Sequence, residues 1–420
     1  MNSTKLTLVF AIIAAIRAQA GDFDLAAKAT NQLGLDLHRQ LATGDENLCL
    51  SPYSIQTALA MAFAGADGET RVEMAKALHF PVQDDPIHPS FAALQHSLEE
   101  MAKNTANIAE ASKKSGGPSE PITLAIANRL FAQSGYDFLD SFRSFINRLY
   151  GAAFEPMDFR KNPERARQEI NKWVSEHTRD RIRDLIPPNG IDATTRLVLA
   201  NAIYLKAPWQ TQFNDALTKP APFHVHGGAA VEVPTMNKRA QFGYAKRDRF
   251  TEVAIPYTGR DLQFVIILPD DVKALAAMES ALTADTLAEC AKLETRDVDL
   301  YLPKFKLEPP TIALADKLKT LGMKSAFDDP PGSANFSRIA PRKPNDYLAI
   351  SEVFHKTFIA VDEKGTEAAA ATAVAMLTMA RMQSPPPKPI EIKVDHPFFY
   401  AIQHVPSGTC LFIGRVTDPR

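Results

Sequence analysis

Hydrophobic positions in the first half of the chain recur mostly with helical spacing. Apolar or small side chains three or four residues apart predict an opening helix between about residue 23 and residue 41. Ser51 followed by Pro52 predicts the start of a second helix, because a serine side chain accepts a free N–H and proline fits the first turn. Thr70 and Glu73 have the spacing of a capping box and predict a third helix start.

In the second half of the chain, the hydrophobic pattern changes to short runs that are typical of β-strands. Between them, Thr311 predicts the cap of a helix that Gly322 ends. Helices concentrated early and strands concentrated late, without an internal repeat, indicate the α+β class. The predicted strands cover residues 197–205, 252–255, 262–268, 298–302 and 348–361.

Residues 363–377 combine small side chains with a strand pattern. Read with a period of two, the face that begins at Thr366 carries no charge, whereas Glu367 lies on the opposite face. A proline-rich stretch at 384–389 follows, and such a stretch belongs on the surface. A segment that suits both an exposed loop and a buried strand is a candidate two-state switch. Its uncharged face consists of Thr366, Ala368, Ala370, Thr372, Val374 and Met376.

Composition excludes several classes of function. The 420 residues are 45% hydrophobic and 23% charged, which is ordinary for a globular protein, and their length alone favours two or more domains. The net charge of -2 gives no basic surface, so neither nucleic acid nor an acidic membrane is an expected partner.

The first twenty residues have the pattern of a secretory signal peptide. Lys5 precedes an apolar run at 6–16, and Ala18 and Ala20 place small residues where a signal peptidase cuts. We therefore expect a mature chain that begins at Gly21 and is secreted, into the periplasm if the source is bacterial. The apolar run is too short to anchor the chain in a bilayer.

The remaining chemistry of the sequence predicts neither catalysis nor a bound metal. The known catalytic and phosphate-binding motifs are absent, and His224 and His226 lack further ligands nearby, so no enzyme activity and no cofactor is expected. Cys49, Cys290 and Cys410 are too few for a disulfide framework. We expect buried free thiols, with a bridge between Cys49 and Cys410 as the alternative.

Several ordered runs of residues resemble the serpin family across residues 22–420. The resemblance implies one domain over residues 21–420, with three β-sheets, about nine helices and an exposed reactive-centre loop at about 363–390, and it replaces the expectation of two domains. Ala207 departs from the pattern, because the family usually has glycine there. The matching runs are NLCLSPYSI at 47–55, NAIYLKAPW at 201–209, LPKFKLE at 302–308, LGMKSAF at 321–327, ISEVFHK at 350–356, HPFFY at 396–400 and FIGRVTDP at 412–419.

The resemblance implies a secreted inhibitor of serine proteases. In this family a protease cuts the exposed loop, and the loop then inserts into the central sheet and traps the protease as an acyl-enzyme. A hinge of small, uncharged residues suits insertion, because a charge on the buried face would cost several kcal/mol. A binding, carrier or chaperone protein of the same fold is the alternative. The hinge residues are Glu363, Gly365, Thr366, Ala368, Ala369, Ala370, Ala371 and Thr372.

The reactive bond follows from the spacing that is usual in inhibitory relatives. The residue before the cut lies sixteen positions after Glu363, which predicts the bond Met379–Ala380. A shift of two residues gives Arg381–Met382. Methionine at this position suits proteases with elastase-, chymotrypsin- or subtilisin-like pockets, whereas Arg381 suits trypsin-like ones.

Other family sites carry over one residue at a time. Ser54, Asn201 and His355 match a polar cluster beneath the central sheet, called the shutter. Trp209 matches an aromatic residue at the point where insertion begins, called the breach, and Lys304 matches the partner of a hinge salt bridge to Glu363. Residues 88–104, which bind heparin in some relatives, are not basic here, so heparin is not expected to bind, and the chain is expected to be a monomer.

Overall fold

The computed structural model describes residues 23–82, 86–114, 120–152, 154–225, 230–367 and 388–420. Within these ranges the chain forms nine α-helices and seventeen strands, so the predicted α+β class is confirmed. Short 3-10 turns cover Asp215–Leu217, Cys290–Lys292 and Ser325–Phe327. The helices are α2 (Asp24–Leu41), α3 (Pro52–Gly65), α4 (Gly68–Ala77), α5 (Ile87–Lys114), α6 (Asp140–Tyr150), α7 (Pro163–His177), α8 (Leu275–Ala281), α9 (Ala284–Glu289) and α10 (Ala315–Thr320).

One sheet, called the central sheet here, pairs strands that lie far apart in the sequence. Its main path has the order β10-β13-β14-β4-β12-β11, and β2 and β3 extend it beside β4. The strand β12 pairs with β4 in parallel, whereas β2 pairs with β4 antiparallel. The strands are β2 (Thr123–Gln133), β3 (Glu155–Met157), β4 (Leu197–Pro208), β10 (Phe305–Leu307), β11 (Ile312–Ala313), β12 (Ile350–Thr357), β13 (Ile359–Asp362) and β14 (Gly365–Thr366).

The remaining strands form a second hydrogen-bonded sheet with two halves. The long strand β6 pairs with β5 and β9 over most of its length and with β7 at its end, and so it joins the halves. These halves and the central sheet account for the three sheets that the sequence implies. The strands are β1 (Leu48–Leu50), β5 (Lys219–His224), β6 (Ala230–Lys246), β7 (Phe250–Pro256), β8 (Leu262–Pro269), β9 (Thr295–Pro303), β15 (Ile390–Lys393), β16 (Phe398–His404) and β17 (Thr409–Val416).

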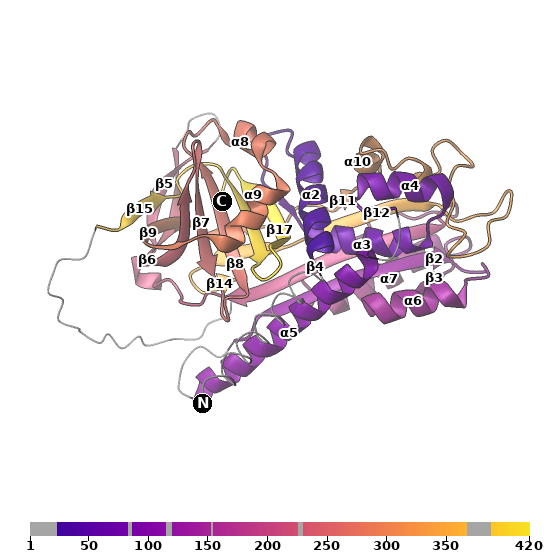
Figure 1. Ribbon diagram of the computed structural model, residues 1–420, viewed down its shortest axis with the longest axis horizontal. Helices are drawn as coiled ribbons and strands as arrows, with labels where there is room; N and C mark the ends of the chain where they lie inside the picture. The colour runs from indigo at the N-terminus through magenta and orange to yellow at the C-terminus, as the bar shows by residue number, and fades with distance from the viewer. Residues whose placement is uncertain (1–22, 83–85, 115–119, 153, 226–229, 368–387) are drawn as a thin grey trace, which may run out of the picture.

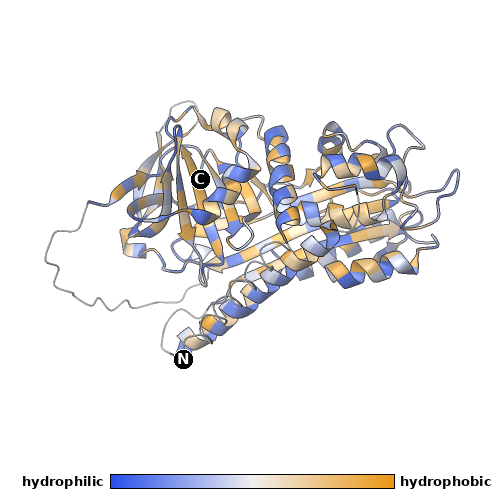
Figure 2. Ribbon diagram, in the orientation of Figure 1, coloured by the Kyte–Doolittle hydropathy of each residue, from blue (hydrophilic) through white to orange (hydrophobic). Residues whose placement is uncertain are grey.

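Hydrophobic residues fill both faces of the central sheet, which is why β4 reads as a continuous apolar run. Odd-numbered residues of β4, from Leu197 to Ala207, mostly join the main core, whereas Val198, Ala200 and Ala202 pack against α7. Figure 1 shows β4 running between the strand-rich end of the molecule and the helical end. Figure 2 shows hydrophobic residues gathered on the strands and hydrophilic residues along α5.

Most of the predicted element positions agree with the structure. The opening helix is α2, and β4, β7, β8 and β9 contain the strands predicted between residues 197 and 302. The second helix begins at Pro52, with the Ser51 side chain accepting the Ser54 N–H at 3.2 Å, as the capping prediction requires. The run predicted at 348–361 is divided into β12 and β13 around Phe358.

Two predicted helix caps are wrong. Thr70 lies inside α4, and the Glu73 carboxylate accepts hydrogen bonds from the backbone and hydroxyl of Ser325 instead. Thr311 lies outside α10, whose first N–H, from Ala315, donates to Glu352 at 2.9 Å. In both cases a distant side chain overrides the local signal. No helix of the described residues is long and apolar enough to cross a membrane.

Candidate functional site

The contact between β4 and β12, called the seam here, is closed along most of its length and occupied by a third strand at one end. Hydrogen-bonded pairing runs from Leu197 beside Ile350 to Ile203 beside Thr357. Beyond that point β14 lies between β13 and β4, with Thr366 opposite Ala207. The chain therefore turns back after β13 and begins a new strand inside the sheet.

A tight turn between β13 and β14 allows this reversal. The Asp362 carboxylate accepts hydrogen bonds from the backbone N–H groups of Lys364 at 2.8 Å and Gly365 at 3.2 Å. Gly365 has φ +152°, and a Cβ atom there would lie 2.1 Å from the carbonyl oxygen of Ala207. Only glycine fits this close approach of two backbones.

Trp209 fixes the turn against the end of β4. Its indole N–H donates to the carbonyl of Asp362 at 2.8 Å, and its backbone N–H donates to the carbonyl of Lys364 at 2.9 Å. The indole ring is buried and stacks on Tyr257, with ring centroids 4.6 Å apart and planes 5° apart. The aromatic residue expected at the breach thus contacts the turn directly.

Glu363 forms the ion pair that the resemblance implies. Its carboxylate lies 2.7 Å from the Lys304 Nζ and accepts a hydrogen bond from the Thr218 hydroxyl at 2.7 Å. Burial raises the pKa of Glu363, but the hydrogen bonds from Lys304 and Thr218 outweigh it and hold the pKa below its ordinary value. Lys304 remains partly exposed, so the pair is worth no more than ~1 kcal/mol.

Thr366 and Glu367 lie on opposite faces of the central sheet. Thr366 is 1% exposed, and its hydroxyl lies 2.5 Å from the Tyr257 hydroxyl on the core side. The Glu367 side chain points to the α7 side, where Arg181 forms an ion pair with it and only 12% of it remains exposed. Burial raises the pKa of Glu367, and Arg181 opposes this shift. Glu367 also has φ +47°, a conformation that costs most residues energy.

A chain of hydrogen bonds crosses the seam below β14. His355 is fully buried, and its Nε2 accepts the Ser51 backbone N–H at 3.1 Å, so its Nδ1 carries the proton and donates to the Asn201 oxygen. The Asn201 amide then donates to Asn128 at 3.0 Å, which also accepts the Ser54 hydroxyl at 2.7 Å. These contacts bring together Ser54, Asn201 and His355.

His355 is held neutral. Burial lowers its pKa to about 3. The Ser51 N–H needs an acceptor and the Asn201 oxygen needs a donor. A neutral imidazole provides both, because one of its nitrogens accepts and the other donates. We call Ser54, Asn128, Asn201 and His355 the seam lock, since the bond between His355 and Asn201 joins the two strands that border the seam.

The sequence did not single out several residues of this site. Asn128 belongs to the seam lock because β2 places it opposite Asn201. The available signal was a polar pair, Asn128 and Arg129, between the apolar residues 124–127 and 130–132 of this strand. No local sequence pattern points to Tyr257, Thr218 or Arg181 as site residues. Each of them contacts the hinge only because the tertiary fold brings it there.

The predicted reactive bond lies outside the described residues, as does part of the hinge. Met379–Ala380, the alternative Arg381–Met382 and the hinge residues 368–372 all fall between Glu367 and Lys388, where the structure does not describe the chain. The described chain resumes at Lys388, and β15 then pairs with β9 in parallel.

The three cysteines are buried free thiols, as expected, and the alternative bridge between Cys49 and Cys410 is not formed. Burial raises the pKa of Cys49 to about 11, which keeps the thiol protonated. Among the described residues, no group of three or more His, Cys, Asp or Glu side chains could hold a metal ion.

Known proteins resemble this chain over nearly its whole length. The profile of the family described as Serpin (serine protease inhibitor) matches residues 28–419. A Bos taurus protein named leukocyte elastase inhibitor is 38% identical over 383 residues, which are 89% of this chain and 93% of the relative. A Thermococcus kodakarensis protein named as an uncharacterized serpin-like protein is 38% identical over 393 residues, covering 93% of this chain and 85% of that protein.

Solved structures agree with the sequence comparisons. Uncleaved ovalbumin superposes with a TM-score of 0.76 at 26% identity, covering 94% of this chain and 100% of that one. Serpin48, described as a highly specific serpin of the insect Tenebrio molitor, gives a TM-score of 0.75 at 30% identity, covering 93% of this chain and 97% of that one.

Proposed function

Because the chain belongs to the serpin family, we propose that it inhibits a serine protease as a suicide substrate. The protease serine attacks the carbonyl carbon of Met379, an ester forms, and the amine of Ala380 leaves with the C-terminal piece. The freed loop then inserts into the seam between β4 and β12 and carries the protease with it. The protease active site is distorted, so water does not hydrolyse the ester.

The observation that carries this proposal is β14 itself. Its two residues already occupy the place of an added strand between β13 and β4. If the strand continued in the same register, Ala368 would lie opposite Leu205, Ala370 opposite Ile203 and Thr372 opposite Asn201. Opposed residues of antiparallel strands point to the same face.

The side chains of the loop fit the surroundings that this register gives them. The β4 partners of Ala368, Ala370, Val374 and Met376 are buried in the main core, where small or apolar residues are favourable. Thr372 would bring its hydroxyl beside Asn201, at the level where the seam lock must open. The uncharged face of the loop therefore meets the core without burying a charge.

The same register gives the distance over which the protease moves. Met379 would lie opposite Thr194, just beyond the far end of β4, so the inserted strand would span about 40 Å at ~3.3 Å per residue. A cavity of ≈ 800 Å³ lies at that end of the seam, with Thr194, Arg196 and Ser351 among its lining residues. It offers room for the last inserted residues.

The expected target is a protease that accepts methionine before the cut. The relative named leukocyte elastase inhibitor makes an elastase the first protease to test. Use of the bond Arg381–Met382 would instead select a trypsin-like enzyme. Secretion, expected from residues 1–20, would place the inhibitor where extracellular proteases act.

Incubation with elastase, chymotrypsin, subtilisin and trypsin tests the proposal. We expect an adduct that resists SDS, and sequencing of the released peptide should begin at Ala380 or, for the alternative bond, at Met382. Cleavage of the loop without an adduct for any of these proteases would contradict inhibition and favour a binding, carrier or chaperone role.

A further inference from the structure

The chain that follows the reactive-centre loop joins the second sheet through one short strand. This strand, β15, lies at the edge of the sheet and pairs with β9 over four residues. Glu391 and Lys393 are exposed, so β15 buries little of its surface. The next three residues, 394–396, are called the stem here. They attach the C-terminal end of the loop to the body of the protein.

The stem contacts three further strands of the same sheet. The Val394 backbone N–H donates to the carbonyl of Tyr301 in β9 at 2.9 Å, and the Asp395 carbonyl accepts the backbone N–H of His224 in β5 at 2.7 Å. The third contact is made by the side chain of His396, which is 9% exposed and reaches the end of β8.

Both ring nitrogens of His396 face hydrogen-bond acceptors. Nδ1 lies 2.8 Å from a carboxylate oxygen of Asp395, and Nε2 lies 2.8 Å from the carbonyl oxygen of Pro269. A neutral imidazole has one N–H and can donate to only one of them, whereas the imidazolium ion donates to both. His355 is the opposite case, because its ring lies between one donor and one acceptor.

The surroundings of His396 favour the protonated ring. Burial lowers its pKa, but the hydrogen bonds to Asp395 and to the Pro269 carbonyl outweigh burial, and the pKa is raised above its ordinary value. The negative charge of Asp271, just after β8, acts in the same direction. The hydrogen bond from His396 in turn lowers the pKa of Asp395, so this carboxylate is ionised at neutral pH.

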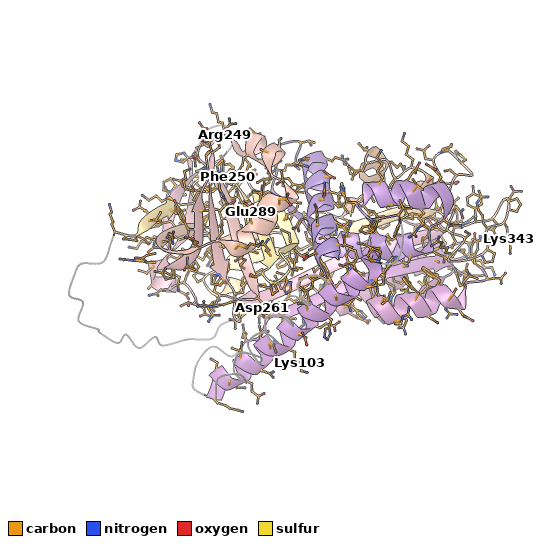
Figure 3. The ribbon with its side chains drawn as sticks, in the orientation of Figure 1. Lys103, Arg249, Phe250, Asp261, Glu289 and Lys343 are labelled. Atoms are coloured by element: carbon orange, nitrogen blue, oxygen red, sulfur yellow. The ribbon has the colours of Figure 1, made fainter. Side chains whose placement is uncertain are left out.

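The other charged groups of these elements pair with one another or are exposed. Beside the stem, the Lys393 Nζ lies 2.6 Å from the Glu391 carboxylate. After β8, Asp270 forms an ion pair with Lys246. Arg249 of the adjoining turn is 85% exposed and lies at the periphery of the molecule in Figure 3. The charge of the imidazole therefore decides how firmly the stem is held.

We propose that His396 is a positioning residue that clamps the C-terminal end of the reactive-centre loop when its ring is protonated. The imidazolium ion joins Asp395 of the stem to Pro269 of β8. Loss of the proton removes one of these two bonds, so the stem and β15 separate from the sheet more readily. The clamp is complete below about pH 6.5 and weakens as the pH rises through the raised pKa of His396. Its effect on inhibition rests on the proposed function, whereas the clamp itself does not.

Hydrogen exchange of the Val394 amide in the intact protein, without protease, tests the clamp. After correction for the intrinsic exchange rate, protection should fall about tenfold from pH 6 to pH 9, the change that ~1.4 kcal/mol produces. His396→Gln should have weak protection at pH 6 that does not vary with pH, and Asp395→Asn should reduce the variation. The controls are His224→Gln, whose side chain also interacts with Asp395, and the exposed His96→Gln. Both should keep the variation.

The same pH dependence of Val394 protection in the unaltered protein and in His396→Gln would overturn the clamp. Circular dichroism checks that each variant is folded. If His396→Gln does not fold, Asp395→Asn decides the question, because an undiminished pH dependence in that variant would equally overturn the clamp.

The effect on inhibition is measured by adduct formation with one protease at pH 6 and pH 9. Dividing the rate of the unaltered protein by that of His396→Gln removes the pH dependence of the protease itself. This ratio should be larger at pH 6 by about threefold or more, because only the unaltered loop is clamped there. An equal ratio, with Val394 protection still dependent on pH, would overturn the role in inhibition alone. Absence of any adduct would refute the proposed function and leave the clamp standing.

Discussion

The two ends of the seam differ in whether a third strand lies between the strands that border it. At the hinge, a turn held by Asp362 and Trp209 places β14 between β13 and β4. Farther from the hinge, the seam lock joins His355 to Asn201, and β4 and β12 are paired directly. The hinge is held by bonds to the turn, whereas the lock depends on side chains that insertion must separate. Under the proposed mechanism, insertion would therefore start at the hinge and be limited by the seam lock.

Of the substitutions considered, Thr366→Arg should impair the trapping of protease most severely. Thr366 lies in the core beside Tyr257, and arginine there would bury an unpaired charge. A cost of ~3 kcal/mol lowers the yield of trapped protease by about a hundredfold. The protein should become a substrate that is cut without forming an adduct.

The control for this prediction is Thr366→Val, which keeps the size of the side chain without a charge. We expect it to retain most of the trapping, measured as the ratio of adduct to cleaved protein on SDS gels. If Thr366→Arg trapped protease as well as Thr366→Val, trapping would not depend on the hinge remaining in the core, and the insertion mechanism would be contradicted.

His355→Ala should weaken the seam lock. It leaves the Ser51 N–H and the Asn201 oxygen buried without partners, which costs roughly 3 kcal/mol in the intact protein. In the cleaved protein an inserted loop would already separate His355 from Asn201, so the loss should be smaller. Urea denaturation midpoints of both forms measure the difference, with the exposed His96→Ala as the control. If His355→Ala lowered the stability of the intact and cleaved forms equally, the seam lock would not be what keeps the seam closed.

The pH dependence of stability should report on the same histidine. The pKa of His355 is about 3 in the folded protein and ordinarily 6.5. Between these values the unfolded chain binds more protons, so the free energy of unfolding falls as the pH is lowered from about 6.5. Ser51 and Asn201, which form hydrogen bonds with the imidazole, do not titrate.

A comparison with His355→Gln isolates this contribution. The unaltered protein should lose up to ~1.4 kcal/mol more per pH unit than the variant between about pH 6 and pH 4. His88 and His404, whose pKa values burial also lowers, are present in both proteins and cancel. Parallel stability curves would show that His355 is not held neutral by the lock.

The smallest expected effect concerns Lys304 and Glu363. Lys304→Met should reduce the stability of the intact protein by less than ~1 kcal/mol, because the lysine is partly exposed. A double-mutant cycle with Glu363→Gln measures the pair itself. A coupling of several kcal/mol would mean that the ion pair, rather than the turn, holds β14 in place.

Elements with a strong hydrophobic pattern were predictable from the sequence. The helix α2 buries one regular face, and the strands β4 and β8 are continuous apolar runs buried on both faces, so local pattern and tertiary fold agree. The strand β6 was not predicted, because its residues are mostly exposed or half-buried and carry no hydrophobic run. Glu73 and Glu352 serve partners far along the chain, which a local capping signal cannot reveal.

The candidate site also contains residues that the sequence could identify and contacts that only the fold reveals. Ser54, Asn201, Trp209 and His355 lie in runs that resemble the family, so the sequence could identify them. The hinge faces follow from the period-two pattern, yet the burial of Glu367 beside Arg181 depends on the segment after α7. Such a contact between segments almost two hundred residues apart arises only from the fold.

The most direct test compares the melting temperature of the intact protein with that of the protein cut in its loop. If closing the seam leaves the fold short of its most stable arrangement, cleavage lets the loop complete the central sheet. The cut protein should then melt far above the intact one. A cut protein that melts at or below the temperature of the intact protein would contradict insertion as the driving force.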